Sequence, residues 1–271
     1  MSLPSGAAKV RAAFARAAEE ERAALVAYLM AGHPDDEASL GAAEAALDAG
    51  ADLLEIGVPF SDPVADGPII AAAGHQTVAS GGGFESAVRL ARALRARGHT
   101  QPLLAMGYLN PLVARGMATS LRQLADAGLD GVILPDLPAA EDRQVERLIA
   151  DAGLGVVFLV TPNTSAGRLE AAVRASTAFL YVVPLFGVTG ARAGLADATA
   201  ALRDRVRAAA AGRIPVAVGF GITRPEQARD LAAHADGVVV GTAIVAALSE
   251  SGPAGVGRLV ASLAGAVSAH R

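Results

Sequence analysis

The chain has 271 residues, of which 52% are hydrophobic and 18% charged, and its formal net charge at pH 7 is -4. This composition is too apolar for a disordered chain, and the Arg residues scattered among Asp and Glu form no basic stripe for nucleic acid. No apolar run approaches the ~20 residues of a membrane span and the N-terminal segment lacks a signal-peptide core, so we expect a cytoplasmic protein.

Eight short apolar runs alternate along the chain with Ala-, Leu- and Arg-rich stretches of helical periodicity. Continuous apolar strands of this kind are typical of a parallel sheet covered by helices on both faces, and eight of them close most naturally into a barrel. We therefore expect a single α/β domain over residues 1–271, a (β/α)8 TIM barrel with an N-terminal helix. The predicted strands cover residues 25–31, 52–58, 102–107, 131–136, 155–160, 178–183, 215–221 and 237–243.

An open, doubly wound sheet is the alternative arrangement of the same elements. That fold usually carries a glycine fingerprint after its first strand, and the sequence LMAGHPDD at residues 29–36 has none, so the barrel is favoured. Two segments at the carboxyl ends of strands, residues 57–68 and 187–194, are longer and richer in glycine than a minimal connection. Loops of this kind are expected to bind or cover a ligand.

Glu55 interrupts the second predicted strand, at a position where barrel strands normally carry Val, Ile or Leu. A buried carboxylate is costly, and burial raises its pKa toward the range that suits proton transfer near neutral pH. The structural alternative is a Glu that faces the helices and pairs with an Arg. We favour a Glu55 that points into the mouth of the barrel and acts in catalysis.

Asp66 lies in the loop after that strand, where several prolines limit the conformations of the chain and can hold a carboxylate over the barrel mouth. Its DGP context is equally typical of a turn or a helix cap, so both interpretations stay open. The turn interpretation is stronger for Asp62 and Asp136. The other polar residues at the ends of predicted strands are His33, Asn110, Asn163 and Thr189.

The last two predicted strands end in glycine, with Gly219 and Gly221 after one and Gly241, followed by Thr242, after the other. Glycine N–H groups approach a phosphate closely, and a helix that begins there directs its positive end at the same anion. Gly190, in the preceding long loop, adds a further donor. Tight turns without a ligand are the alternative, but the two loops together favour a phosphate site.

Metal and cofactor chemistry have little support in this sequence. The five His residues are dispersed without a pair at ligand spacing, and neither a Walker loop nor a Rossmann fingerprint is present. The chain has no Cys, and its only Lys is Lys9, in the predicted N-terminal helix. Disulfides and thiol nucleophiles are therefore excluded, and Schiff-base chemistry lacks an amine at a strand end.

The segment LLEIGVPFSDPVADGPII, residues 53–70, resembles the signature of the tryptophan synthase alpha chain family, and GVTG, GFGI and GTAIV resemble the family's later landmarks in the same order. The first motif is highly specific, whereas GFGI alone occurs in several phosphate-binding barrels. The resemblance implies a lyase of L-tryptophan biosynthesis that splits indole-3-glycerol phosphate into indole and glyceraldehyde 3-phosphate. It also implies no cofactor on this chain, and a pyridoxal-phosphate beta chain as partner in an alpha–beta heterotetramer.

The resemblance assigns roles by position. Glu55 matches the family's general acid and base, Asp66 its second catalytic carboxylate, and Tyr181 a tyrosine of the active-site wall. The phosphate-binding positions match Gly190, Gly221, Gly241 and Thr242, the last where Ser is common. Candidates for the apolar indole slot, each of which also fits an ordinary core position, are Tyr28, Met106, Ile133 and Leu159.

Three positions depart from the family pattern. His33 stands where the family usually has Asp, and Pro184 and Leu185 stand where it has Ser and a polar residue. The latter two flank the strand-six lid and bear on lid closure, the partner and the substrate. The alternatives are a free-standing indole-3-glycerol phosphate lyase that releases indole, a catalytically silent phosphate-binding barrel, and a phosphosugar isomerase or aldolase, whose usual Schiff-base and metal mechanisms lack residues here.

Overall fold

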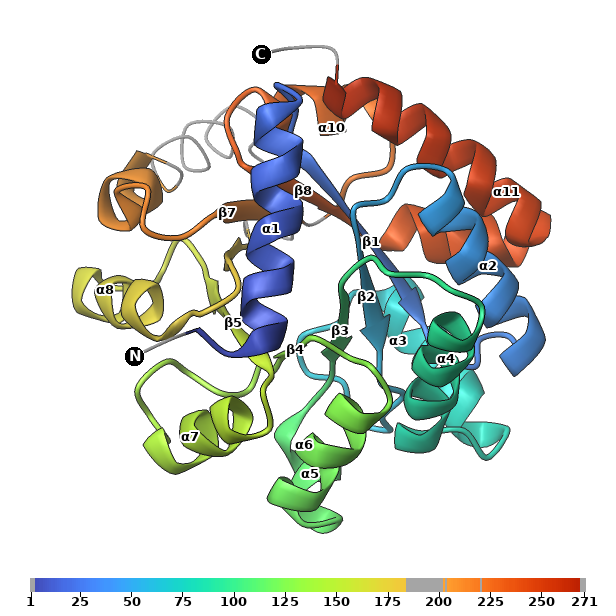
Figure 1. Cartoon of the computed structure of the whole chain (residues 1–271). Coiled ribbons are helices and arrows are strands. Elements are labelled where there is room, and N and C mark those ends of the chain that lie inside the picture. Colours follow the sequence, from blue (N-terminus) through green and yellow to red (C-terminus); the bar gives the residue numbers. More distant parts are fainter. Residues whose placement is uncertain (1–2, 184–201, 203, 220, 269–271) are drawn as a thin grey trace.

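The computed structural model describes residues 3–183, 202, 204–219 and 221–268. Helices and strands alternate through most of this part of the chain (Figure 1). In chain order the elements are α1 (Ser5–Glu19), β1 (Ala24–Met30), α2 (Asp36–Asp48), β2 (Leu53–Gly57), α3 (Pro68–Ala79), α4 (Phe84–Ala96), β3 (Leu103–Met106), α5 (Leu109–Ala114), α6 (Met117–Asp126), β4 (Gly131–Ile133), α7 (Arg143–Asp151), β5 (Gly155–Val160), α8 (Ala166–Ala175), β6 (Leu180–Val182), β7 (Val216–Gly219), α10 (Pro225–Ala232), β8 (Gly237–Val240) and α11 (Thr242–Ser268), which is kinked at Gly252.

The strands form one closed sheet in which every neighbouring pair is parallel, and β8 returns to pair with β1. The predicted barrel is therefore confirmed. Most strands are shorter than the sequence suggested, and the reason is clear for β4 and β8. β4 ends before Pro135, which has no N–H to donate to a neighbouring strand, and the last residues of the eighth predicted strand belong to α11, which begins at Thr242.

Side chains alternate between the two faces of each strand, which separates the apolar residues into two layers. Residues on the outer face, such as Leu25 and Leu54, pack under the surrounding helices. Their sequence neighbours, such as Val26 and Leu53, fill the interior of the barrel. The inward positions nearest the carboxyl ends of the strands are therefore the ones that reach the mouth.

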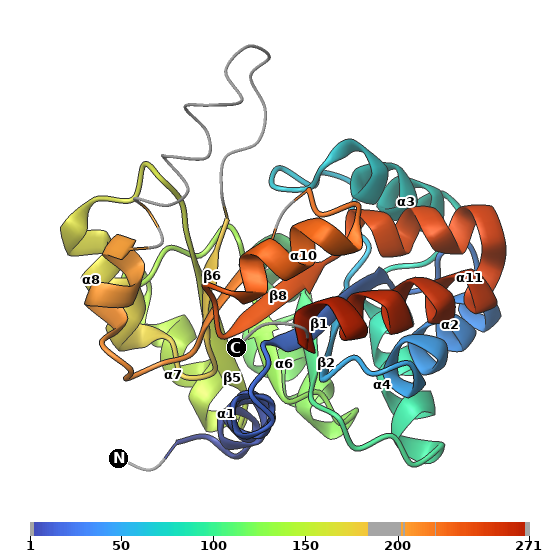
Figure 2. The ribbon, with the colours of Figure 1, turned by 90° about the horizontal axis from the view of Figure 1, so that it is seen from above.

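Helix α1 closes the end of the barrel at which the strands begin (Figure 1). Its residues Val10 and Phe14 belong to the interior core, and the Phe14 ring lies 5.3 Å from the Phe179 ring, measured between centroids. Figure 2 shows α1 and α3 on opposite sides of the barrel, so α1 leaves the mouth open. In the described part of the chain, no helix is both long and apolar enough to cross a membrane.

A repeated hydrogen-bond pair joins the strands at the closed end. In each case a residue shortly before an even-numbered strand donates its N–H to the carbonyl of a residue near the start of the preceding strand. The side chain of the first residue then accepts the N–H of the second. The distances lie between 2.7 and 3.0 Å, and the pairs are Asp52 with Leu25, Asp130 with Leu103, Thr177 with Val156, and Asp236 with Val216. These side chains replace the sheet hydrogen bonds that the strand ends would otherwise lack.

Removing the Asp52 side chain should test the contribution of these pairs to stability. Asp52 is 6% exposed and also accepts two hydrogen bonds from Arg22, at 2.6 and 2.8 Å. We expect Asp52→Ala to lower the free energy of unfolding in urea by about 3 kcal/mol, because it leaves a buried N–H without its acceptor and removes one of the two carboxylates that pair with Arg22. Asp48→Ala, on the exposed surface of α2, is the matched control and should change it by less than about 0.5 kcal/mol. Equal effects of the two variants would contradict this role.

Candidate active site

A cavity opens at the mouth of the barrel, at the end opposite α1. Its lining comes from the ends of several strands, the loop after β2 and the first turns of α3 and α11. The residues are Tyr28, Glu55, Ala65, Asp66, Gly67, Ile70, Met106, Tyr181, Gly221, Val239, Gly241 and Thr242. Segments far apart in the sequence therefore meet at one site.

Glu55 points into this cavity because it is the second inward-facing residue of β2, after Leu53. Only 1% of its surface is exposed, and its Oε2 atom has no hydrogen-bond partner in the described structure. Burial, together with the charge of Asp66, raises the pKa of Glu55 to about 8. A carboxyl group with this pKa is protonated at neutral pH and able to donate a proton.

Asp66 faces the same cavity from the loop between β2 and α3. Burial raises its pKa to about 6, while a hydrogen bond from Tyr108 lowers the pKa and so limits the rise. At neutral pH Asp66 is therefore mainly ionised. The two carboxyl groups share one cavity but hold different protonation states, as an acid and a fixed negative charge must.

Two tyrosines stand beside Glu55. Tyr28 is its register neighbour on β1, and Gly57 makes room for the Tyr28 hydroxyl, which would lie 2.2 Å from a Cβ at that position. Tyr181 lies on β6, and burial raises the pKa of both phenols well above 10.0. Both hydroxyls therefore stay neutral and polar within the cavity.

The predicted phosphate positions are brought together only in part. Gly221, Gly241 and Thr242 line the cavity, and α11 starts at Thr242, so the N-terminus of that helix lies there. Gly219 is not among the lining residues. A Cβ on Gly219 would lie 2.5 Å from the Cβ of Val239, so its lack of a side chain serves packing. Gly190 and Thr189 lie outside the described residues, as do Pro184 and Leu185.

Only some of the candidates for the indole slot line the cavity. Tyr28 and Met106 line the cavity, whereas Ile133 and Leu159 are not among its lining residues and pack with the interior core. Ile133 is fully buried there, which matches the alternative of an ordinary core position.

The remaining polar candidates are not among the residues that line the cavity. Asp62 is exposed and accepts a hydrogen bond from the Ser61 hydroxyl, and Asp136 accepts the N–H of Leu109 at the start of α5. His33 is buried after β1, with its Nε2 atom 3.2 Å from the Ser249 hydroxyl. Asn110 and Asn163 are exposed. The contact of Asp62 is thus local, as in a turn, whereas Asp136 binds the start of a helix that precedes it in the chain.

Sequence reasoning missed Tyr108, which follows β3 and hydrogen-bonds to the loop that carries Asp66. It also missed Ala65, Gly67 and Ile70 in the cavity lining. The position of Tyr108 directly after a predicted strand could have revealed it, because polar side chains at such positions lie at the mouth of a barrel. Asn110 was selected there instead, and it is exposed.

The fold and the site together define a class of protein, a (β/α)8 barrel with two carboxyl groups of raised pKa in one cavity at the carboxyl ends of its strands. In the described ranges no group of three or more His, Cys, Asp or Glu residues is arranged to hold a metal ion.

Comparisons with known proteins give the family. The family model described as tryptophan synthase alpha chain matches residues 14–263. Tryptophan synthase alpha chains from Phenylobacterium zucineum and Roseiflexus castenholzii are 44% and 40% identical, over 90% and 89% of this chain and 87% and 91% of their own length. This chain belongs to the tryptophan synthase alpha chain family.

Solved structures agree with this placement. The aminoacrylate-bound form of tryptophan synthase from M. tuberculosis matches with a TM-score of 0.86 at 36% identity, over 96% of this chain and 99% of that one. The alpha subunit from Legionella pneumophila str. Paris matches with a TM-score of 0.86 at 31% identity, over 96% and 98%.

The raised pKa of Glu55 predicts a pH-dependent cost to stability. Because its pKa in the folded state, about 8, lies above the usual 4.5, the folded protein binds this proton more tightly than the unfolded chain. The stability gained by binding that proton is fully present below the ordinary pKa of 4.5 and is lost as pH rises through the folded-state pKa of about 8. Urea unfolding of Glu55→Gln and wild type should therefore show the variant gaining, relative to wild type, on the order of a few kcal/mol from acidic to mildly alkaline pH.

The control for this measurement is Glu37→Gln, which removes a carboxylate from the exposed first turn of α2. If both variants gain equally on wild type as pH rises, the burial of Glu55 is not the cause. A difference between Glu55→Gln and wild type that does not vary with pH would also contradict the prediction.

Proposed function

We propose that this chain cleaves indole-3-glycerol phosphate into indole and glyceraldehyde 3-phosphate in L-tryptophan biosynthesis, with Glu55 and Asp66 as its catalytic residues. The activity follows from membership of the family. The observation that carries the residue assignment is the pair of carboxyl groups in one cavity, with pKa values of about 8 and about 6 on either side of neutrality.

The reaction needs one proton to enter and one to leave. Protonated Glu55 gives its proton to ring carbon 3 of the indole, and the positive charge that develops on the ring nitrogen is stabilised by ionised Asp66, which accepts the ring N–H. The Glu55 carboxylate then takes the proton from the hydroxyl on the adjacent side-chain carbon. As that hydroxyl becomes an aldehyde, the carbon–carbon bond breaks and its electron pair returns to the ring. Glu55 is protonated again at the end.

The phosphate of the substrate would bind opposite the carboxylates, at Gly221, Gly241 and the first turn of α11. The N–H groups at this helix start are hydrogen-bond donors, and the helix dipole favours an anion there. Gly221 has a φ of 68°, a conformation that glycine adopts without strain. Gly190 completes our assignment of the phosphate-binding residues, whereas Gly219 packs against Val239 beside the site. Tyr28, Met106 and Tyr181 are assigned to the wall around the indole ring.

A beta chain is the proposed partner, and an exposed apolar groove beside the mouth fits it. Val64 is 83% exposed and Val113 is 58% exposed, and both line an open groove between the Asp66 loop and α5. Exposed apolar groups gathered at one groove are typical of an interaction surface. Because the groove adjoins the loop that carries Asp66, a docked partner would also influence the site.

Two wider assignments belong to the same proposal. We infer that residues 1–271 act as one barrel domain and that the protein works in the cytoplasm, where amino-acid biosynthesis takes place. The free-standing lyase, which would release indole without a partner, is the second candidate, and it is supported by the atypical sequence of the strand-six lid, with Pro184 and Leu185.

Activity assays of purified wild-type chain and two variants test the proposal directly. We expect Glu55→Gln and Asp66→Asn to lower kcat for indole release by at least about a hundredfold, since each removes a group that acts on the reacting ring. Adding a tryptophan synthase beta chain should stimulate the wild type. Robust unaided turnover without stimulation would favour the free-standing enzyme, and no indole under either condition would refute the lyase assignment.

The control for the partner is Val113→Asp, an exposed change on α5 outside the cavity. It should leave unaided activity unchanged and reduce stimulation by the beta chain, because a charge in the groove would be buried on docking. Full stimulation of this variant would place the docking surface elsewhere.

The pH profile of kcat/KM provides a separate prediction. The reaction needs ionised Asp66 and protonated Glu55, so activity should rise as pH increases through about 6 and fall as it increases through about 8. In Asp66→Asn the charge that helps raise the pKa of Glu55 is gone, so the alkaline limb of the residual activity should move to lower pH. A kcat/KM that does not change with pH, from below about 6 to above about 8, would contradict the assignment.

A further inference from the structure

We propose that Tyr108 is a positioning residue, whose hydroxyl fixes the loop after β2 and holds the Asp66 carboxylate in its place over the barrel mouth. The inference rests on the proposed function of Asp66. Tyr108 does not line the cavity that holds the two carboxyl groups, so it acts through Asp66.

Two contacts of the Tyr108 side chain reach the Asp66 loop. The backbone N–H of Ala65, the residue before Asp66, donates to the Tyr108 hydroxyl oxygen at 3.1 Å. The Phe60 ring, at the start of the loop, packs on the Tyr108 ring with 5.5 Å between centroids and an angle of 36°. Tyr108 is therefore in contact with both ends of the loop, and only 4% of its surface is exposed.

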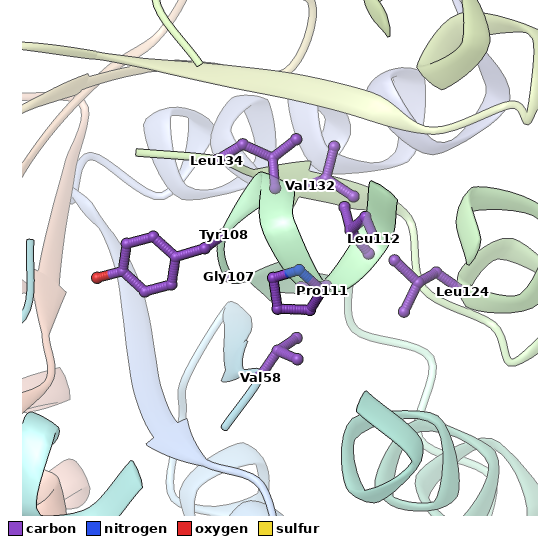
Figure 3. Close-up of a pocket in the computed structure, with 9 residues that line it drawn as sticks. Val58, Gly107, Tyr108, Pro111, Leu112, Leu124, Val132 and Leu134 are labelled. Carbon is purple, nitrogen blue, oxygen red and sulfur yellow. The ribbon is translucent and has the colours of Figure 1, made fainter. Parts of the chain in front are cut away.

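The backbone around Tyr108 is fixed from the other side. Gly107 donates its N–H to the carbonyl of Ile133 at 3.1 Å, and Leu109 donates its N–H to Asp136 at 2.9 Å. Behind the ring, apolar side chains from β4, α5 and α6 line a small cavity, and Figure 3 shows the Tyr108 hydroxyl pointing away from it. The backbone that carries Tyr108 is thus held in place by hydrogen bonds on both sides, whereas the Asp66 carboxylate lies on a loop.

The hydrogen-bond directions assign a second task to this hydroxyl. Since its oxygen accepts the Ala65 N–H, its own hydrogen is free to donate, and the acceptor beside it is the Asp66 carboxylate. Burial and the Asp66 charge raise the pKa of Tyr108, which keeps the donor protonated. Donation stabilises the ionised form of Asp66 and lowers its pKa, against the effect of burial. The Tyr108 hydroxyl therefore influences both the position of the loop and the protonation state of Asp66.

Tyr108→Phe tests this inference, because it keeps the ring and its packing and removes only the hydroxyl. For the full chain we expect kcat for indole release at neutral pH to fall about tenfold or more with little change in KM, as expected when a transition-state interaction is weakened. The acid limb of the kcat/KM profile should move to higher pH. An independent readout is the pKa of Asp66 in the unliganded variant, followed by NMR of its carboxyl carbon, which should rise.

Phe60→Leu is the matched control, since it removes the ring contact and keeps both polar contacts of Tyr108. Its acid limb should stay where it is in the wild type. An unchanged kcat in Tyr108→Phe would overturn the inference, and so would a loss of activity that is equal at every pH with an unchanged Asp66 pKa, because that result belongs to a purely structural residue. Wild-type chain that makes no indole would instead refute the proposed function, and the NMR measurement would still test the contact.

Discussion

The alternation of side chains along a strand in a closed barrel is the constraint on which this structure depends. Every second residue of β2 must face the interior, so after Leu53 the next inward position is Glu55, at the level of the mouth. A register shift of one residue would place Ile56 in the cavity and turn the carboxylate towards the apolar helix layer. Barrel closure thus determines both the burial of Glu55 and the rise of its pKa.

Buried carboxyl groups at the two ends of the barrel differ in their hydrogen-bond and ion-pair partners. At the closed end Asp52 and Asp130 are held by backbone N–H groups and by Arg22, Lys9 or Arg95, so their charges are compensated. At the mouth one oxygen of Glu55 has no partner in the described structure. The first arrangement stabilises the fold, and the second costs stability but gives Glu55 a pKa near neutral pH, as the proposed proton transfer requires. Stability and chemistry are therefore separated along the barrel axis.

Asp66 shows how a loop residue gains a defined position. Its loop leaves β2, but the hydroxyl that contacts it comes from Tyr108 after β3, the next strand of the sheet. Neighbouring strands bring their following loops together, so a contact between them is available wherever the chain supplies a donor and an acceptor. The same loop borders the exposed groove with Val64, which connects the proposed partner surface to the site.

The sequence by itself determined the fold and the residue at its centre. Continuous apolar runs identified the strands because burial on both faces leaves a local pattern, and Glu55 was visible because it breaks that pattern. The local sequence left the role of Asp66 open, since its DGP context is an ordinary turn sequence, and only the resemblance to the family favoured it. Gly219 could not be separated from Gly221, nor could the contact of Tyr108 be seen. The tertiary structure decided these points, because depth in the cavity and contacts between loops depend on how the strands close in space, which local patterns do not record.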